Sequence, residues 1–326
     1  MNTNKKIDFV YCFDTNFNYQ AFSSMISLLD AVSENINIHI LHNDLKTLKN
    51  IPSKITNHSN LSKLSKHEFK DTNLNFPNLE TSHVSQATYY RLFISKYIKV
   101  ESTFIVYIDA DMICISDPIT SIQETISELE KSSLLVAAKT EIEKKLTKEE
   151  LEAYMKMEFF KRYWPFDRLP INNKYFNAGF MIINLDLWKQ NNIYSKLLDC
   201  MDEIRNKIVA WDQDILNSVI KDNYLELDSK FNLFSQHYFN NNNTVHFLHY
   251  YGSKKPWKTD GIFNHNSETY HKNFRKVNQA TYHIEHTWRL HSLKQLIYNI
   301  LNLKFFKLQY PISFIKEFIS SMYYKK

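Results

Sequence analysis

Two aspartates stand one residue apart at the end of an apolar run. Residues 103–108 read TFIVYI, and they lead into Asp109 and Asp111 within the stretch YIDADMICISDP. An unpaired carboxylate is costly to bury, so two of them at the tip of a buried strand need compensation. Oxygen ligands at positions i and i+2 suit one hard divalent cation, Mg²⁺ or Mn²⁺, which can bridge a diphosphate. The alternative is a solvated strand end at which Asp117 begins a turn.

Two further stretches carry groups that suit the same chemistry. FLHYYGSKKPW places His249 at the end of a predicted strand, with Lys255 shortly after it. Imidazole is an acceptable Mn²⁺ ligand, and a lysine ammonium binds phosphate as a point charge. WDQDILN sets Asp212, Gln213 and Asp214 directly before an apolar helix, where the helix dipole alone would also favour acidic residues. A metal flanked by a lysine could neutralise a leaving nucleoside diphosphate as a Lewis acid.

Glycine is scarce in this chain. It has three glycines, Gly179, Gly252 and Gly261, where average usage would give about 23. We expect positions that keep glycine to need a positive φ or a close backbone approach, although ordinary turns are the alternative. The chain contains neither G-x-G-x-x-G nor a P-loop, so a phosphate-bearing ligand would have to bind a metal or side chains.

Apolar runs alternate with helical patterns along the chain. Strands are expected at residues 7–13, 36–42, 103–108, 134–139, 179–185 and 244–251, and helices at 19–34 and 85–98. This alternation indicates an α/β fold with a mainly parallel sheet, whose ligands bind beyond the carboxyl ends of the strands. Residues 141–173 form a charged helical insertion on the expected acceptor side, in which Thr147 and Glu150 are typical of a helix start.

Six stretches in order, spread over residues 7–257, together resemble one enzyme family. They are DTNFNY, SQATYYRLFI, YIDADMICISDP, YFNAGFMIINLDLW, DQDILN and HYYGSKKPW. The set resembles glycosyltransferase family 8, the bacterial α-galactosyl- and α-glucosyltransferases of lipopolysaccharide and lipooligosaccharide synthesis. The resemblance implies a GT-A type fold, a UDP-galactose or UDP-glucose donor, Mn²⁺ with Mg²⁺ as the alternative, a surface-glycan acceptor, and retention of anomeric configuration.

The resemblance also implies roles for individual residues. The implied metal ligands are Asp109, Asp111 and His249. The residues implied to contact the donor are Asp14, Asn18 and Tyr19 at the uracil, Ala110 at the nucleoside, Arg91 at the sugar or diphosphate, Asn177, Ala178 and Asp212 at the sugar, Gly252 and Lys255 at the diphosphate, and His83 closing over the donor. The family usually has DDNY where this chain has the longer DTNFNY.

The resemblance places Gln213 near the anomeric carbon. An amide is a poor nucleophile, and a covalent route needs a carboxylate beneath the sugar. We therefore favour same-face attack through an oxocarbenium-like state, with Asp214 as the alternative nucleophile.

Charge is distributed unevenly. Residues 271–326 contain ten Lys or Arg and two Glu, whereas the other 270 residues contain 30 basic and 33 acidic residues. We therefore predict a catalytic domain at 1–270 and a basic amphipathic tail at 271–326. Apolar residues recur in the tail at three- and four-residue spacing, at Leu290, Leu293, Ile297, Ile300, Leu301, Leu308, Ile315, Phe318, Ile319 and Met322.

This pattern favours an interfacial anchor on an anionic membrane over nucleic-acid binding, and it fits a glycolipid acceptor. Two helices packed on the catalytic domain are the alternative. The three cysteines lack metal-type spacing, and the chain has no good signal peptide and no apolar run of membrane-spanning length. We therefore expect a cytoplasmic protein that is peripheral on the inner face of the membrane.

Two other function classes remain open. A phosphatase of the haloacid dehalogenase type also has D-x-D after a strand, typically the first one, whereas this pair lies beyond residue 100. A non-catalytic glycan- or lipid-binding relative is the second alternative, and the intact metal and DQD residues argue against it.

Overall fold

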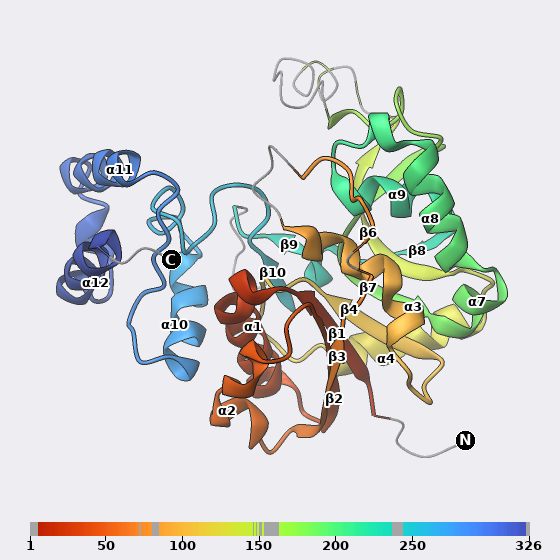
Figure 1. Ribbon diagram of the computed structural model, residues 1–326, viewed down its shortest axis with the longest axis horizontal. Helices are drawn as coiled ribbons and strands as arrows, with labels where there is room; N and C mark the ends of the chain where they lie inside the picture. Colours follow the sequence, from red (N-terminus) through yellow and green to blue (C-terminus); the bar gives the residue numbers. More distant parts are fainter. Residues whose placement is uncertain are drawn as a thin grey trace.

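The structure is a computed structural model that describes residues 6–71, 73–79, 85–145, 147, 149, 152, 163–236 and 244–323. Its centre is a seven-stranded sheet with helices on both faces (Figure 1). In spatial order the strands are β3 (Leu61–Glu68), β2 (Ile36–His42), β1 (Asp8–Phe13), β4 (Phe104–Ile108), β7 (Lys174–Asn184), β6 (Val136–Glu143) and β8 (Tyr224–Glu226). β7 runs antiparallel to both of its neighbours, and the remaining pairings are parallel. The predicted α/β fold with a mainly parallel sheet is confirmed.

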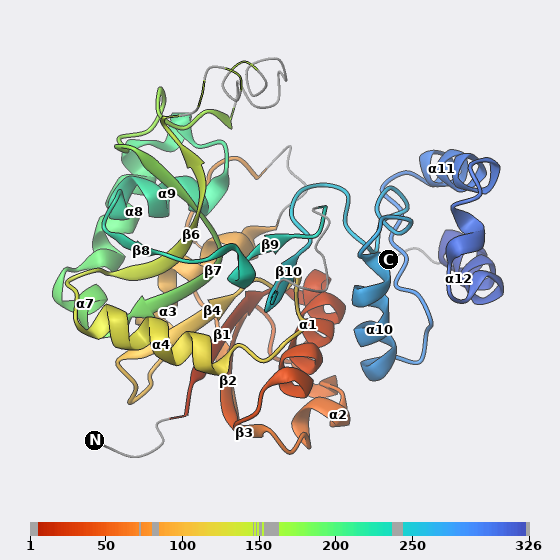
Figure 2. The ribbon, with the colours of Figure 1, turned by 180° about the vertical axis from the view of Figure 1, so that it is seen from behind.

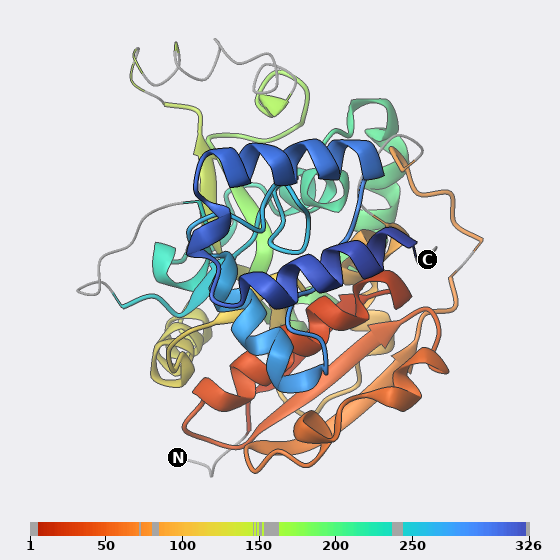
Figure 3. The same cartoon turned by 90° about the vertical axis from the view of Figure 1, so that its left-hand side faces the viewer.

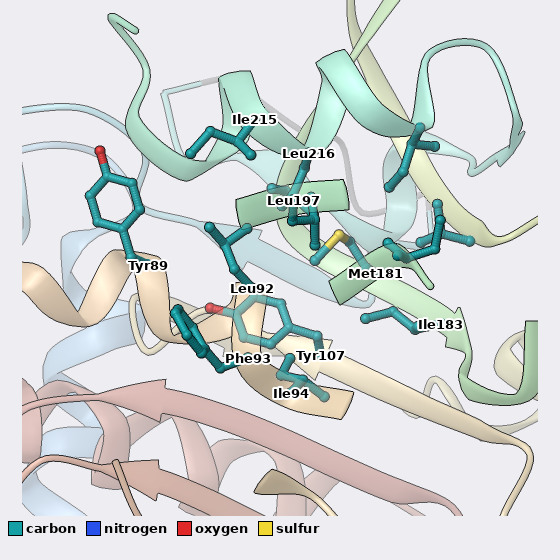
Figure 4. Close-up of a cluster of buried hydrophobic side chains, with 14 of the residues drawn as sticks. Tyr89, Leu92, Phe93, Ile94, Tyr107, Met181, Ile183, Leu197, Ile215 and Leu216 are labelled. Carbon is teal, nitrogen blue, oxygen red and sulfur yellow. The ribbon is translucent and has the colours of Figure 1, made fainter. Parts of the chain in front are cut away.

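The central strands are apolar throughout because both faces of the sheet are covered. One face carries α1 (Asn18–Ala31), α2 (Ser53–Thr56) and α4 (Ile119–Glu130). The other carries α3 (Ile94–Tyr97), α7 (Leu185–Gln190), α8 (Ile193–Glu203) and α9 (Trp211–Ile220). Figure 4 shows this second core, in which Tyr107, Met181 and Ile183 of the sheet meet Leu197 and Ile215 of the helices.

Residues 85–98, predicted as one helix, form the 3₁₀-helix η3 (Gln86–Phe93) followed by the single turn of α3. A 3₁₀-helix has about three residues per turn, so side chains at i and i+3 lie above one another. Thr88 and Arg91 are related in this way, and both contact Asp212. The other described 3₁₀-helices are η1 (Thr15–Phe17), η2 (Thr47–Asn50), η4 (Arg205–Lys207), η5 (Ser229–Phe231) and η6 (Phe305–Lys307).

A small second sheet carries the last predicted strand. It consists of β5 (Met112–Cys114), β10 (Phe247–His249) and β9 (Leu233–Phe234). β10 runs antiparallel to β5, with His249 opposite Met112. This register brings His249 beside Asp111, although more than a hundred residues separate them in the chain.

Three helices follow the sheets. α10 (Ser267–Val277) packs on α1, so the predicted boundary at residue 270 falls inside a helix that contacts the catalytic body. α11 (Arg289–Leu301) and α12 (Pro311–Tyr323) stand at one end of the molecule, beyond α10 (Figures 1 and 2). Phe314, Phe318 and Leu296 pack with Ile262 and Tyr282 in a separate small core beneath these two helices.

The predicted insertion is described only in part. Residues 141–143 belong to β6, and residues 163–173 lead into β7. Glu150, the second residue of the predicted helix start, lies outside the described residues. Within the described ranges, the helices are too short or too polar to cross a bilayer.

Candidate active site

A cavity of about 430 Å³ lies where β1 and β4 end. This volume is within the range of small-molecule sites, and the carboxyl ends of parallel strands are where such sites form. Its wall includes five residues that the sequence analysis assigned to the metal or the donor, namely Arg91, Asp109, Ala110, Asp111 and Lys255.

Asp109, Asp111 and His249 form a cluster beside this cavity. Their ligand atoms all lie within 4.8 Å of one another, although the three residues come from two strand ends in different sheets. Oδ1 of Asp111 is buried without a hydrogen-bond partner, and it lies 3.4 Å from Nε2 of His249. Two carboxylates and one imidazole are a donor set that Mn²⁺ accepts, so the residues present fit a divalent cation.

The two carboxylates of this cluster have opposite electrostatic environments. Burial raises the pKa of Asp111, but the charges of Lys255 and His249 outweigh it and hold that pKa well below its usual range. Burial raises the pKa of Asp109 above its ordinary value, because Arg91 offsets the desolvation only in part. A bound cation would compensate the charge at Asp109 that burial disfavours.

Arg91 joins the metal cluster to α9. Its Nη2 atom lies 2.9 Å from Asp109, its Nε atom lies 2.7 Å from Asp212, and its Nη1 donates to the carbonyl of Ala178 at 2.7 Å. The guanidinium carbon also lies 4.7 Å from the centre of the Tyr107 ring. Arg91 therefore fixes two carboxylates and one backbone carbonyl relative to one another at the cavity wall.

Asp212 is buried behind Arg91. The hydroxyl of Thr88 donates to its Oδ1 atom at 2.8 Å. Burial raises the pKa of Asp212 to about 6, and Arg91 opposes that shift. Thr88 and Arg91 therefore fix the position of the Asp212 carboxylate.

Gln213 and the start of β7 lie together. The backbone N–H of Ala178 donates to Oε1 of Gln213 at 3.1 Å, and Asn217 ties α9 to the backbone of Phe176. Asn177 and Gln213 both donate to Oε2 of Glu141, each at 3.0 Å. Glu141 was not predicted from the sequence, where it is one of several charged residues in β6.

Asp214 faces away from the cavity. Its carboxylate accepts two bonds from Arg168 and one from the hydroxyl of Tyr175. The backbone N–H groups of Val209 and Ala210 donate to the same carboxylate at 2.7 and 2.8 Å. Both oxygens are therefore occupied, and Asp214 joins the stem of the insertion to α9.

The residues predicted to contact the uracil lie on either side of η1, with Asp14 before it and Asn18 and Tyr19 at the start of α1. Asp14 caps η1, where its carboxylate accepts from the N–H of Asn16 at 2.9 Å. Asn16 and Phe17 line the cavity, whereas Asn18 and Tyr19 begin α1 and are absent from its wall. The longer stretch DTNFNY forms the 3₁₀ turn η1 between Asp14 and Asn18, and this turn carries the two wall residues Asn16 and Phe17.

Gly179 and Gly252 meet the expectation that the retained glycines need a close backbone approach or a positive φ. A Cβ on Gly179 would come within 2.6 Å of Cε1 of His249, so glycine there makes room for the imidazole. Gly252 adopts a φ of 80°, the left-handed region, in the turn that leads to Lys255. His83 lies outside the described residues.

The sequence analysis left several cavity residues unassigned. Three of them, Trp257, Lys258 and Glu285, come from the C-terminal part of the chain. The backbone N–H of Glu285 donates to the carbonyl of Trp257 at 2.7 Å, and Glu285 pairs with Lys258 in an isolated bridge. Glu285 lies just before α11, so the base of the C-terminal helices forms part of the site.

Comparison with known proteins gives one consistent result. The sequence model of glycosyl transferase family 8 matches residues 8–261. The chain is 32% identical over 193 residues to a lipopolysaccharide 1,3-galactosyltransferase of Salmonella typhimurium, covering 56% of this chain and 52% of that one. It is 27% identical over 219 residues to general stress protein A of Bacillus subtilis, covering 62% and 69% of the two chains.

Among solved structures, a crystal structure of the galactosyltransferase LgtC with donor and acceptor sugar analogs superposes with a TM-score of 0.66. That match has 18% identity and covers 83% of this chain and 96% of the other. At this identity it confirms the GT-A-like fold. The chain spans about half the length of the Salmonella relative.

Proposed function

The chain belongs to glycosyltransferase family 8, and on that premise we propose that it transfers galactose or glucose from a UDP-sugar to a surface glycan, with retention of configuration. The observation that carries this proposal is the cluster of Asp109, Asp111 and His249 beside a cavity that Lys255 also lines. The similarity to a lipopolysaccharide galactosyltransferase supports a hexose donor and a lipooligosaccharide-type acceptor.

The metal cluster suits a diphosphate leaving group. Asp109, Asp111 and His249 would hold Mn²⁺ or Mg²⁺, which supplies Lewis-acid neutralisation of the diphosphate when bound. The ammonium of Lys255 contacts Asp111 and the carbonyl of Tyr250, and it lies on the cavity wall, where it can add positive charge against phosphate oxygens. No glycine-rich cradle is needed with these groups in place.

The arrangement of α9 favours same-face attack. Gln213 is held by Ala178 and Glu141, so its amide is fixed in one orientation beside the sugar positions implied for Asn177 and Asp212. An amide oxygen in this place can stabilise an oxocarbenium-like state without forming a covalent bond to the sugar. Because both oxygens of Asp214 are occupied by five donors, we assign that residue a structural role.

A thermal-shift panel of UDP-sugars tests the donor assignment. UDP-galactose or UDP-glucose should raise the melting temperature only when Mn²⁺ or Mg²⁺ is present, because the diphosphate needs the cation. Asp111→Ala should abolish this shift and lower transfer by several orders of magnitude while the fold survives. Near-wild-type transfer by Asp111→Ala with EDTA present would refute the metal assignment. Phosphate release from simple esters, or sugar binding without donor hydrolysis, would favour the phosphatase or the non-catalytic alternative.

We further propose that α11 and α12 bind an anionic membrane from the cytoplasmic side. The two helices lie side by side across the end of the molecule (Figure 3). In α11 the polar Ser292 and Asn299 are buried, whereas Leu293, Ile297 and Leu301 are exposed by 44%, 50% and 76%. Leu296 is buried on the inner face of α11, so this helix carries apolar side chains on both its inner and its outer face. An exposed apolar face of this kind favours an apolar neighbour.

The surrounding residues fit an interfacial position. Further exposed apolar side chains of this region are Trp288, Leu290, Tyr298, Leu303, Phe306, Tyr310, Ile312, Ile319 and Tyr323. The described basic residues are Arg289, Lys294, Lys304, Lys307 and Lys316. Each basic residue near an anionic surface adds roughly 1 kcal/mol, and added salt weakens this attraction. A protein held in this way would meet a membrane-embedded glycolipid acceptor.

Surface variants separate membrane binding from folding. Leu293→Ser combined with Ile297→Ser should weaken sedimentation with anionic liposomes, because both side chains are exposed. Donor hydrolysis should stay unchanged. Leu296→Ser is the matched control, since Leu296 is buried and its loss should lower the melting temperature instead. Removing residues 286–326 should also abolish liposome binding. Equal liposome binding by the Leu293→Ser, Ile297→Ser variant and the unmodified protein would refute the membrane proposal.

A further inference from the structure

An unbroken run of side-chain hydrogen bonds connects the metal cluster to Gln213. Nδ1 of His249 lies 2.9 Å from Oδ1 of Asn232. Nδ2 of Asn232 donates to Oδ1 of Asn177 at 2.8 Å, and Nδ2 of Asn177 donates to Oε2 of Glu141 at 3.0 Å. Nε2 of Gln213 donates to the same Glu141 oxygen at 3.0 Å. Glu141 is therefore the point at which the two branches meet.

Fixed donors and acceptors set the direction of every bond in this run. An ionised carboxylate only accepts, so Asn177 and Gln213 must both turn their NH₂ groups toward Glu141. Backbone N–H groups only donate, and Gly179 donates to Oδ1 of Asn177 at 3.0 Å while Ala178 donates to Oε1 of Gln213. The carboxylate and the backbone thus impose the same orientation on both amides.

The orientation of Asn177 determines the tautomer of the metal-ligating histidine. Because Oδ1 of Asn177 accepts from Asn232, Asn232 must present its own oxygen to His249. Nδ1 of His249 therefore carries a proton, which leaves Nε2 as the ring nitrogen available to a metal. Nε2 is the atom that lies 3.4 Å from Asp111. A partner on the other ring nitrogen is the usual way in which proteins fix a metal-ligating histidine.

We propose that Glu141 is a positioning residue that sets both the metal-binding nitrogen of His249 and the amide of Gln213. The inference rests on the proposed function, because it concerns the same metal and donor site. Glu141 itself is half-buried at the edge of β6 and is separated from His249 by two amides. Its effect on metal binding is consequently indirect, and it would reach the reacting groups only through Asn177, Asn232 and Gln213.

The test measures metal binding without a donor. Mn²⁺ affinity is measured by calorimetry for the unmodified protein, Glu141→Ala and Glu141→Gln. Glu141→Ala removes the shared acceptor and should weaken Mn²⁺ binding about 10- to 100-fold, the usual effect of losing an outer partner of a ligand. Glu141→Gln keeps a carbonyl oxygen that can accept both bonds, so it should restore most of the affinity. Glu143→Ala, an exposed residue of the same strand, is the matched control and should bind Mn²⁺ normally.

A spectroscopic readout separates positioning from general destabilisation. ¹⁵N spectra of the histidine-labelled, metal-free protein should show His249 protonated at Nδ1, and Glu141→Ala should add the Nε2-protonated form. Glu141→Gln should leave the Nδ1 form dominant. Unchanged Mn²⁺ affinity and an unchanged tautomer in Glu141→Ala would overturn the inference, as would a Glu141→Gln variant as impaired as Glu141→Ala. Failure of the unmodified protein to bind Mn²⁺ would instead refute the proposed function.

Discussion

Replacing Asp214 by asparagine should destabilise the fold far more than it impairs transfer by each folded molecule. The side chain of Asp214 is 0% exposed, and Arg168, which lies 2.5 Å from it, is 14% exposed. Asparagine would present an NH₂ group to donors that now meet an oxygen, and it would leave the guanidinium without its counter-charge. Breaking a buried ion pair from one side costs about 3 kcal/mol or more. For a chain of this size, that loss lowers the melting temperature by roughly 4 °C.

Chemical denaturation and donor hydrolysis measured well below the melting temperature test this expectation. Tyr175→Phe is the graded control, because it removes one donor to Asp214 and should cost about 1 kcal/mol. Hydrolysis per folded molecule should remain measurable in both variants. The reasoning fails if Asp214→Asn keeps its stability while losing transfer, or if a glycosylated Asp214 accumulates in the unmodified enzyme during turnover.

Three further expectations concern individual residues. Gln213→Ala should leave measurable retaining transfer, and inversion of the product configuration would show that the amide does more than position groups. Gly179→Ala should weaken Mn²⁺ binding in calorimetry and cost about 1–3 kcal/mol of stability, since the new Cβ would come within 2.6 Å of the buried His249 ring. Burial lowers the pKa of His271 from 6.5 to about 3, so the stability that depends on its neutral form is complete above pH 6.5 and is lost as the pH falls. Between pH 7 and pH 5 this loss is about 2 kcal/mol by urea denaturation, and His271→Gln should reduce it.

Much of the site could be predicted because its residues occur in short local sequence patterns. The sequence alone shows an apolar run that ends in two aspartates. Both aspartates lie where this pattern predicted them, after β4. The scarcity of glycine pointed to Gly179 and Gly252, and the structure gives each a steric or conformational reason. The alternation of apolar runs predicted the sheet, because buried parallel strands need continuous apolar sequence.

Other features depended on register and packing. η3 was predicted as an α-helix because propensity does not record the aromatic and ionic contacts that favour three residues per turn. The last strand was expected in the main sheet but forms a second one with β5 and β9. Asn16 and Phe17 line the cavity and were not assigned from the sequence, because the conformation of a two-residue insertion cannot be read from its composition. The tail pattern allowed a packed or an exposed apolar face, and the helices have both.

The sequence by itself determined the family, the α/β class and the types of group available for metal and diphosphate binding, because these follow from local order along the chain. Only the tertiary structure decided which of those groups meet. Antiparallel pairing of β10 with β5 brings His249 to Asp111, and the register shift between Thr140 and Ile142, where β6 pairs with β7, lies at Glu141, which contacts Asn177 and Gln213. A hydrogen bond between residues far apart in sequence depends on strand register to within one residue, and a one-residue slip would turn each side chain to the other face.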